Sequence, residues 1–233
     1  MRNLLWAAAF VVLVLSFLFA VPLLTAPAAS AQTPGVTIDK QAETVANHSF
    51  DPAKPPADMP PPTPGEEAEC DSNFLSNAAV SGQARQTDAT HATVTITQVK
   101  VTLQLEIVIW LPNKVTQHVI EHENGHRQIS EVFYQTADKV ADRIAAPYMG
   151  KQVVITGTDL RGQMSKLLEQ MSTDITDEYN KEITPEPTQL RFDAITDHGR
   201  NDVAATNAMA QALKQIPPSL GAPPAAANPA LKL

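Results

Sequence analysis

The clearest structural pattern in the chain is HATVTITQVKVTLQLEIVIWL, residues 91–111. Apolar residues fill alternate positions, the even ones up to Ile96 and the odd ones from Val99 onwards. This period of two predicts β-structure with one buried and one solvated face. The alternation slips by one residue between Ile96 and Val99, which predicts a turn or a bulge near Thr97 and leaves a hairpin open.

A helical pattern follows this strand region. Between Val115 and Ala146 the apolar residues fall three and four positions apart, and Pro147 ends the pattern, so we expect one long helix. With the remaining elements, the expected fold class is α+β, dominated by helices, with a small antiparallel sheet. The remaining elements are a short strand over 151–156, a helix from its N-cap Asp159 to Glu182, a short helical piece, and an alanine-rich helix over 202–213.

The N-terminus has the features of an export signal. One basic residue, Arg2, precedes an apolar run from Leu4 to Leu24, and Ala29-Ser30-Ala31 has the pattern of a cleavage site. We therefore expect residues 1–31 to be a signal peptide and the rest of the chain to be secreted or periplasmic. Without cleavage, the same apolar run is long enough to remain as an N-terminal membrane anchor.

Two further segments are expected to lie outside the folded core. Residues 32–69 contain eight prolines and few apolar residues, so they are predicted to be an extended or disordered linker. Residues 216–233 are rich in proline and alanine and are expected to form a tail. The predicted functional domain is therefore residues 70–215, which is long enough to bury an interior.

The net charge argues against some classes of partner. The whole chain has a formal charge of −8, and without residues 1–31 it has 16 basic against 25 acidic residues. An acidic exported chain is poorly suited to bind nucleic acid or anionic membrane surfaces. Cys70 is the only cysteine, which excludes an internal disulfide.

The motif that carries chemistry is His122-Glu123-Asn124-Gly125-His126, inside the long predicted helix. Residues four apart lie on one helical face, so the two imidazoles can reach one cation. Two neutral imidazoles suit Zn²⁺, which then needs one more protein ligand and an open position for water. Glu123 lies beside that face, where its carboxylate can act as general base toward a zinc-activated water. The alternative is that the two histidines are a structural pair without chemistry.

Gly125 is further evidence that this motif forms a functional site. Glycine inside a helix costs about 1 kcal/mol relative to alanine. Close approach of another element at this position would explain the residue.

The residues after the motif match no known pattern that would identify the third zinc ligand. A metzincin would need glycine at position 129 and histidine at 132, but the chain has Ile129 and Val132. No glutamate of the following helix has the flanking pattern of a thermolysin-like ligand. The remaining downstream histidine is His198, in the stretch FDAITDHG, residues 192–199.

Together, the HENGH motif and this FDAITDHG stretch resemble a bacterial family of uncharacterised, predicted secreted zinc-dependent proteases. The resemblance covers about residues 90–200 and implies a zincin-like metallopeptidase domain. It implies His198 as the third zinc ligand. Asp193 is the alternative ligand, or else a hydrogen-bond partner of a ligating imidazole. Phe192 stands where the relatives usually carry tyrosine, so a role of that hydroxyl would be vacant here.

We therefore expect an exported zinc metallopeptidase that hydrolyses a peptide or protein substrate with a zinc-activated water and Glu123 as general base. The alternative is a non-catalytic envelope binding protein with a structural or degenerate metal site. A zinc amidase that acts on cell-wall peptides would share the same ligands.

Overall fold

The computed structural model describes residues 35–61 and 66–214. The signal peptide expected over 1–31 and the tail expected over 216–233 lie outside these residues. Within the described part, no helix is both long and apolar enough to cross a membrane.

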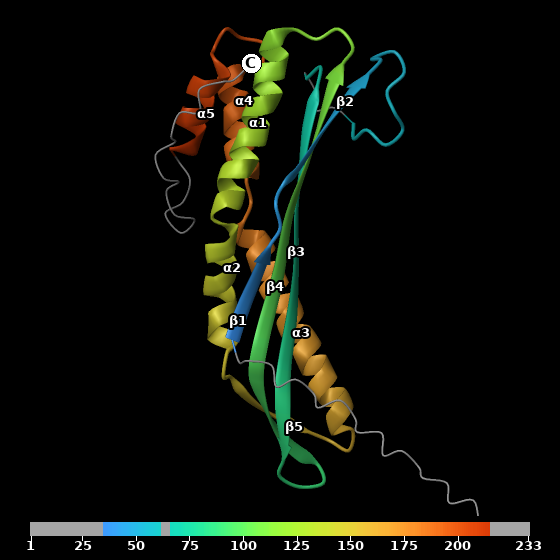
Figure 1. Ribbon diagram of the computed structural model, residues 1–233, viewed down its shortest axis with the longest axis vertical. Coiled ribbons are helices and arrows are strands. Elements are labelled where there is room, and N and C mark those ends of the chain that lie inside the picture. Colours follow the sequence, from blue (N-terminus) through green and yellow to red (C-terminus); the bar gives the residue numbers. More distant parts are fainter. Residues whose placement is uncertain (1–34, 62–65, 215–233) are drawn as a thin grey trace, which may run out of the picture. The chain divides into compact units, whose positions relative to one another are not determined.

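Strand β4 (His91–Pro112) organises the sheet, because the four other strands in the described part of the chain all pair with it. β3 (Glu69–Gln86) runs antiparallel along one side of β4. Along the other side lie β5 (Gln152–Thr156), β1 (Gly35–Lys40) and β2 (Thr44–Phe50), in this order (Figure 1). β1 and β2 are parallel to β4, whereas β5 is antiparallel to it, so the sheet is mixed.

The slip in the alternation of β4 is a β-bulge. Ser81 of β3 pairs with Gln98. The next residue, Gly82, pairs with Ile96, which leaves Thr97 as an extra residue in β4. Apolar residues on both sides of the bulge therefore face the core, and β4 continues as one strand. The predicted bulge is confirmed, and no hairpin interrupts the strand.

Helices cover one face of the sheet (Figure 1), and the apolar side chains of that face are buried beneath them. α1 (Gln117–Gln135) contacts β3 and β4, α2 (Ala137–Ala145) contacts β1 and β4, and α3 (Leu160–Glu182) lies along β3. α4 (Glu186–Thr196) and α5 (Ala205–Leu213) pack against α1. The core between these layers includes Val99, Val101, Leu103, Leu105, Ile107, Ile129, Phe133, Ile175, Tyr179 and Phe192.

The expected class, helix-dominated α+β with a small antiparallel sheet, is wrong. The fold is α/β: within the described residues the sheet has five strands, and β3 and β4 alone are 18 and 22 residues long. It is not an antiparallel sheet, because β1 and β2 run parallel to β4. These two strands come from the N-terminal segment that composition assigned to a linker, so the parallel pairs were missed.

Residues 35–50 form strands rather than a disordered linker, and the folded domain therefore begins well before residue 70. The prolines of the segment lie at position 34 and from 52 onwards, so neither strand contains one. Val36 and Ile38 pack against the core. Phe50 is buried with Met59 and Trp110 in a small second cluster. A composition average over the whole segment concealed these two short strands.

The long helix predicted over 115–146 is divided in two at Thr136. The backbone N–H and the hydroxyl of Thr136 both donate to the carbonyl of Phe133, at 3.3 and 3.2 Å. Threonine can offer the backbone such local alternatives to the regular helical bond. A short 3₁₀ turn, η1 (Ala146–Tyr148), follows α2. The predicted short strand and the helix behind Asp159 are confirmed as β5 and α3.

The Tyr134 hydroxyl links the N-terminal strands to the helical layer through a hydrogen bond. It donates to the carbonyl of Gln41, between β1 and β2, at 2.8 Å, and lies 3.0 Å from the carbonyl of Leu103. We expect Tyr134→Phe to lower the free energy of unfolding by about 1 kcal/mol, because the Gln41 carbonyl loses its donor. Urea unfolding followed by circular dichroism measures this change.

Tyr148→Phe is the matched control. Among the described residues the Tyr148 hydroxyl has no hydrogen bond, although Lys151 lies over the ring. This variant should stay within about 0.5 kcal/mol of the wild type. Equal stability of the two variants would contradict the link between Tyr134 and the N-terminal strands.

Candidate metal site

Helices α1 and α4 bring three metal-ligand atoms together. The Nε2 atoms of His122 and His126, on one face of α1, are 3.2 Å apart. Oδ1 of Asp193, on α4, lies 2.7 Å from His126 Nε2 and 3.5 Å from His122 Nε2. All three side chains are buried. Ligand atoms of a tetrahedral zinc ion are about 3.3 Å apart when each lies about 2.0 Å from the metal. The distances of 3.2 and 3.5 Å are close to this value, whereas the 2.7 Å between His126 and Asp193 is that of a hydrogen bond and would have to lengthen around a metal ion.

A fourth donor comes from the chain just before β3. The ligand atoms of Glu66, His122, His126 and Asp193 all lie within 4.8 Å of one another, so this group could hold a metal ion. Glu66 was not among the predicted ligands, because it lies in the proline-rich segment and belongs to no motif. Nothing in the sequence alone would have identified it.

His198 does not belong to this group of four. Its Nδ1 lies 2.8 Å from Oε1 of Glu66. The structure thus brings together both motif histidines and Asp193, the alternative third ligand, whereas His198 reaches the site only through Glu66. Whether any of these residues binds zinc remains a prediction.

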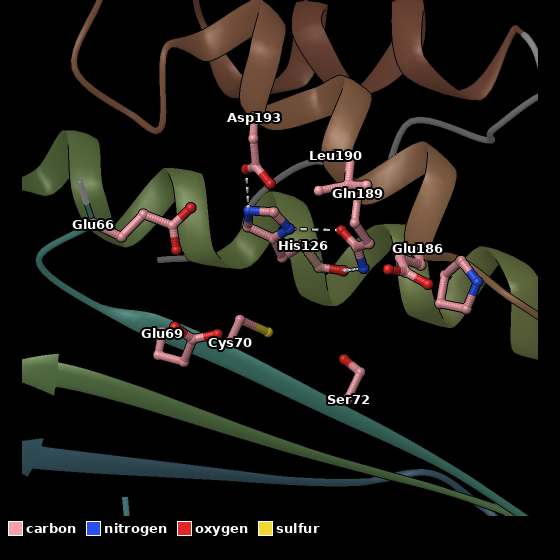
Figure 2. Close-up of a pocket in the computed structure, with 10 residues that line it drawn as sticks. Glu66, Glu69, Cys70, Ser72, His126, Glu186, Gln189, Leu190 and Asp193 are labelled. Atoms are coloured by element: carbon pink, nitrogen blue, oxygen red, sulfur yellow. Dashed lines mark hydrogen bonds and ion pairs between the residues drawn. The ribbon is translucent and has the colours of Figure 1, made fainter. Parts of the chain in front are cut away.

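Gln189 fixes the orientation of His126. Its side-chain oxygen lies 2.6 Å from His126 Nδ1, and its amide nitrogen donates to the His126 carbonyl and to Ser130 Oγ, both at 3.0 Å. With Nδ1–H donating to Gln189, Nε2 is directed toward Asp193 (Figure 2). Gln189 was not predicted to have a role in the site. Its position four residues before Asp193, on the same face of a helix, was the available signal.

Phe192 explains the glycine within the motif. A Cβ atom at Gly125 would lie 2.4 Å from Cζ of Phe192, closer than atoms can approach. The fully buried Phe192 ring stacks on His122, with 5.0 Å between ring centroids, and meets the His126 ring edge-on at 4.9 Å. The expectation that another element approaches Gly125 closely is confirmed.

The chain turns back on the site after α4. Asp197, His198 and Gly199 have φ angles of 49°, 55° and 69°, in the left-handed region that favours glycine. This turn lays Gly199 against His122, where an added Cβ would be 3.0 Å from the ring. Two non-glycine residues in this conformation carry a backbone cost that is typical of functional sites.

Glu123 is buried beside the donors. Only 1% of the residue is exposed, and Oε2 has no hydrogen-bond partner within the described ranges. Burial raises the pKa of Glu123 to about 8; nearby His126 opposes this rise and Glu66 adds to it. A carboxyl group that titrates near neutral pH is suited to accept and release protons during a reaction.

The two histidines differ in protonation. Burial, followed by the proximity of His126, lowers the pKa of His122 to about 4, so His122 is neutral at pH 7. Burial also acts to lower the pKa of His126, but the contact with Asp193 outweighs it and raises this pKa to about 9. A metal ion would meet one free imidazole and would have to displace a proton from the other.

A pocket of about 320 Å³ opens onto this site. Residues of β3 and the segment before it line one side, and residues of α4 line the other (Figure 2). His126 and Asp193 belong to its wall, so a molecule in the pocket would reach the donor atoms. The carboxylic side chains in the wall are Glu66, Glu69, Glu186 and Asp193.

The close contact at Gly125 gives a stability prediction. On helix propensity alone, Gly125→Ala would stabilise α1 by about 1 kcal/mol. We expect the opposite, a loss of about 1–3 kcal/mol, because the new methyl group forces the Phe192 ring out of place. Urea unfolding in the presence of a chelator measures the effect without a contribution from metal.

Gly35→Ala is the control, because, its chain neighbours apart, no atom of the described residues lies within 4 Å of the position its Cβ would take. It should change stability by no more than about 0.5 kcal/mol. Combining Gly125→Ala with Phe192→Leu should cost less than the sum of the two single changes. A stabilising Gly125→Ala would show that α4 does not pack on α1 as described.

No protein-family model, no curated protein and no solved structure matches this chain. The resemblance to secreted zinc-dependent proteases therefore rests on the two sequence motifs.

Proposed function

We propose that the chain is an exported zinc-dependent metallopeptidase in which His122, His126 and Asp193 hold the metal. The observation that carries this proposal is the convergence of two imidazoles and one carboxylate, with spacings of 2.7 to 3.5 Å, beside a buried glutamate. Two imidazoles and one carboxylate are a ligand set of catalytic zinc sites. The motif order, with Glu123 directly after the first histidine, supports the same assignment.

In the proposed hydrolysis of a peptide bond, each residue of the site has a separate role. When bound, zinc supplies Lewis-acid chemistry, which polarises a carbonyl and makes water a nucleophile near neutral pH. Glu123 accepts the proton of the attacking water at its carboxylate and delivers it to the departing amine. Gln189 holds His126 in position, and Phe192 shields the face of the His122 ring from solvent.

The pocket supports a peptide as the substrate. Its volume of about 320 Å³ is enough for a short piece of chain, and it lies beside the donor atoms. The carboxylic side chains in its wall disfavour a strongly acidic ligand. We therefore propose a peptide or protein substrate that is neutral or basic near the bond to be cleaved.

A second candidate is favoured by one observation, the presence of Glu66 as a fourth donor. Zinc sites closed by four protein ligands are typically structural, whereas catalytic sites keep a position open. If Glu66 completes a site of four protein ligands, the chain would be a non-catalytic envelope binding protein with a structural metal site.

Glu123→Gln distinguishes the two functions. The amide cannot accept the proton of water, so we expect the rate of peptide cleavage to fall about 10²–10⁴-fold. Glu123 is not among the four donors, so zinc content should remain one ion per chain. Cleavage of a broad fluorogenic peptide library and elemental analysis measure the two effects.

Glu121→Gln is the control, because Glu121 lies on the same helix but is exposed. It should retain both activity and metal. Wild-type cleavage rates in Glu123→Gln would rule out the proposed mechanism, and no cleavage by the wild-type protein of any peptide in the library would favour the structural site.

The third ligand can be identified by metal binding alone. Asp193→Ala should weaken zinc affinity by more than the 10–100-fold that is typical of losing an outer-shell partner. His198→Ala should retain one zinc ion per chain, because His198 lies outside the donor group. Competition with a chromophoric chelator measures both affinities. The reverse order of effects would assign the third position to His198.

A further inference from the structure

Glu66 reaches the site from a different part of the chain than the other donors. His122 and His126 belong to α1 and Asp193 to α4, whereas Glu66 lies just before β3. Only 6% of the Glu66 side chain is exposed, and its ligand atom is within 4.8 Å of those of the other three. Its carboxylate is therefore near enough to the other three donors to serve as a fourth ligand of a metal ion that they hold.

We propose that Glu66 is a displaceable fourth donor, held over the metal position by His198, so that the resting protein closes its own active site. This inference rests on the proposed function. A peptidase needs an open position for water and for the scissile carbonyl. While Glu66 fills that position, neither can enter, and cleavage requires Glu66 to move away.

The four donors differ in how firmly the contacts around them hold them in place. His126 is fixed by Gln189 and Asp193, and His122 is covered by Phe192 and Gly199. These contacts come from helices or from the turn packed on them. Glu66 belongs to no helix or strand, and the partner identified for it is His198, 2.8 Å away. We infer that Glu66 is the donor that yields to a substrate.

His198 is a positioning residue in this account. It lies in the left-handed turn after α4, and 30% of its side chain is exposed. The turn sets Nδ1 against Oε1 of Glu66 rather than against the metal position. The same turn lays Gly199 on His122, so this one segment contacts both the Glu66 carboxylate and the imidazole of His122.

Glu66 also lines the pocket, together with His126 and Asp193. A peptide in the pocket therefore meets this carboxylate beside His126 and Asp193. A backbone carbonyl oxygen of the peptide can take the vacated position. The class of ligand that opens the site is therefore a peptide that presents a carbonyl group, and a free metal ion alone leaves the site closed.

The test replaces Glu66 in the full chain and reads out metal binding separately from catalysis. Glu66→Ala should weaken zinc affinity about 10-fold and change the visible absorption spectrum of the Co²⁺-loaded protein. Removal of a competing ligand raises the open fraction, so kcat/KM for peptide cleavage should rise by up to about the same 10-fold factor. Glu66→Gln, which keeps the size of the side chain, should behave similarly and guards against misfolding of the alanine variant.

Glu67→Ala is the matched control, since Glu67 is adjacent, equally charged and exposed. It should alter neither the Co²⁺ spectrum nor kcat/KM. His198→Ala should act in the same direction as Glu66→Ala but more weakly, and the double variant should add little to Glu66→Ala alone.

The outcomes separate this inference from the proposed function. Unchanged zinc affinity and an unchanged Co²⁺ spectrum in Glu66→Ala would overturn the inference, even if the wild type cleaves peptides in a Glu123-dependent manner. A fall in kcat/KM would overturn it as well, because Glu66 would then assist catalysis. If Glu66→Ala alters metal binding while no variant cleaves any peptide, Glu66 is a permanent ligand, and both the displacement and the peptidase function are refuted.

Discussion

Phe192 packs against Gly125 so closely that even one methyl group at position 125 would collide with the ring. The contact fixes the distance between α1 and α4. Because Asp193 and Gln189 are neighbours of Phe192 on α4, the same distance sets where a carboxylate and an amide meet the His126 imidazole. The spacing of the donors is thus a consequence of helix packing. Glycine is less favourable than alanine inside a helix, but only glycine at position 125 leaves room for the Phe192 ring.

The sheet provides the rigid support for this pair of helices. Inward side chains of β4, from Val94 to Ile109, are buried under the helical layer, and Ile129 and Phe133 of α1 belong to the same core. Ser130 donates to Ser72 of β3 at 2.9 Å, next to Gln189. The wall of the pocket and the orientation of His126 therefore depend on one hydrogen-bonded network between strand and helices.

Local patterns predicted the parts of the fold that are local. The alternation in residues 91–111 identified β4 and its bulge, and the histidine spacing identified the face of α1 that carries the site. The parallel pairs of β1 and β2 with β4 join residues about sixty positions apart, and two short strands beside a run of prolines leave almost no pattern. Glu66 was missed for the same reason, since only the folded chain brings it near His122.

Asp193 and His198 illustrate a limit of reading a motif without its backbone. Both lie in one short stretch, and histidine is the more familiar zinc ligand. The left-handed turn at residues 197–199 directs His198 to Glu66, while the last turn of α4 directs Asp193 to the two imidazoles. Backbone conformation, which the residue types alone do not reveal, decides between them.

Anomalous X-ray diffraction at the zinc edge, from crystals of the zinc-loaded protein, can show whether two imidazoles and the Asp193 carboxylate share one zinc ion. We expect one strong peak about 2.0–2.2 Å from Nε2 of His122, Nε2 of His126 and an oxygen of Asp193. A peak at another position, or one ligated by His198 in place of Asp193, would contradict it.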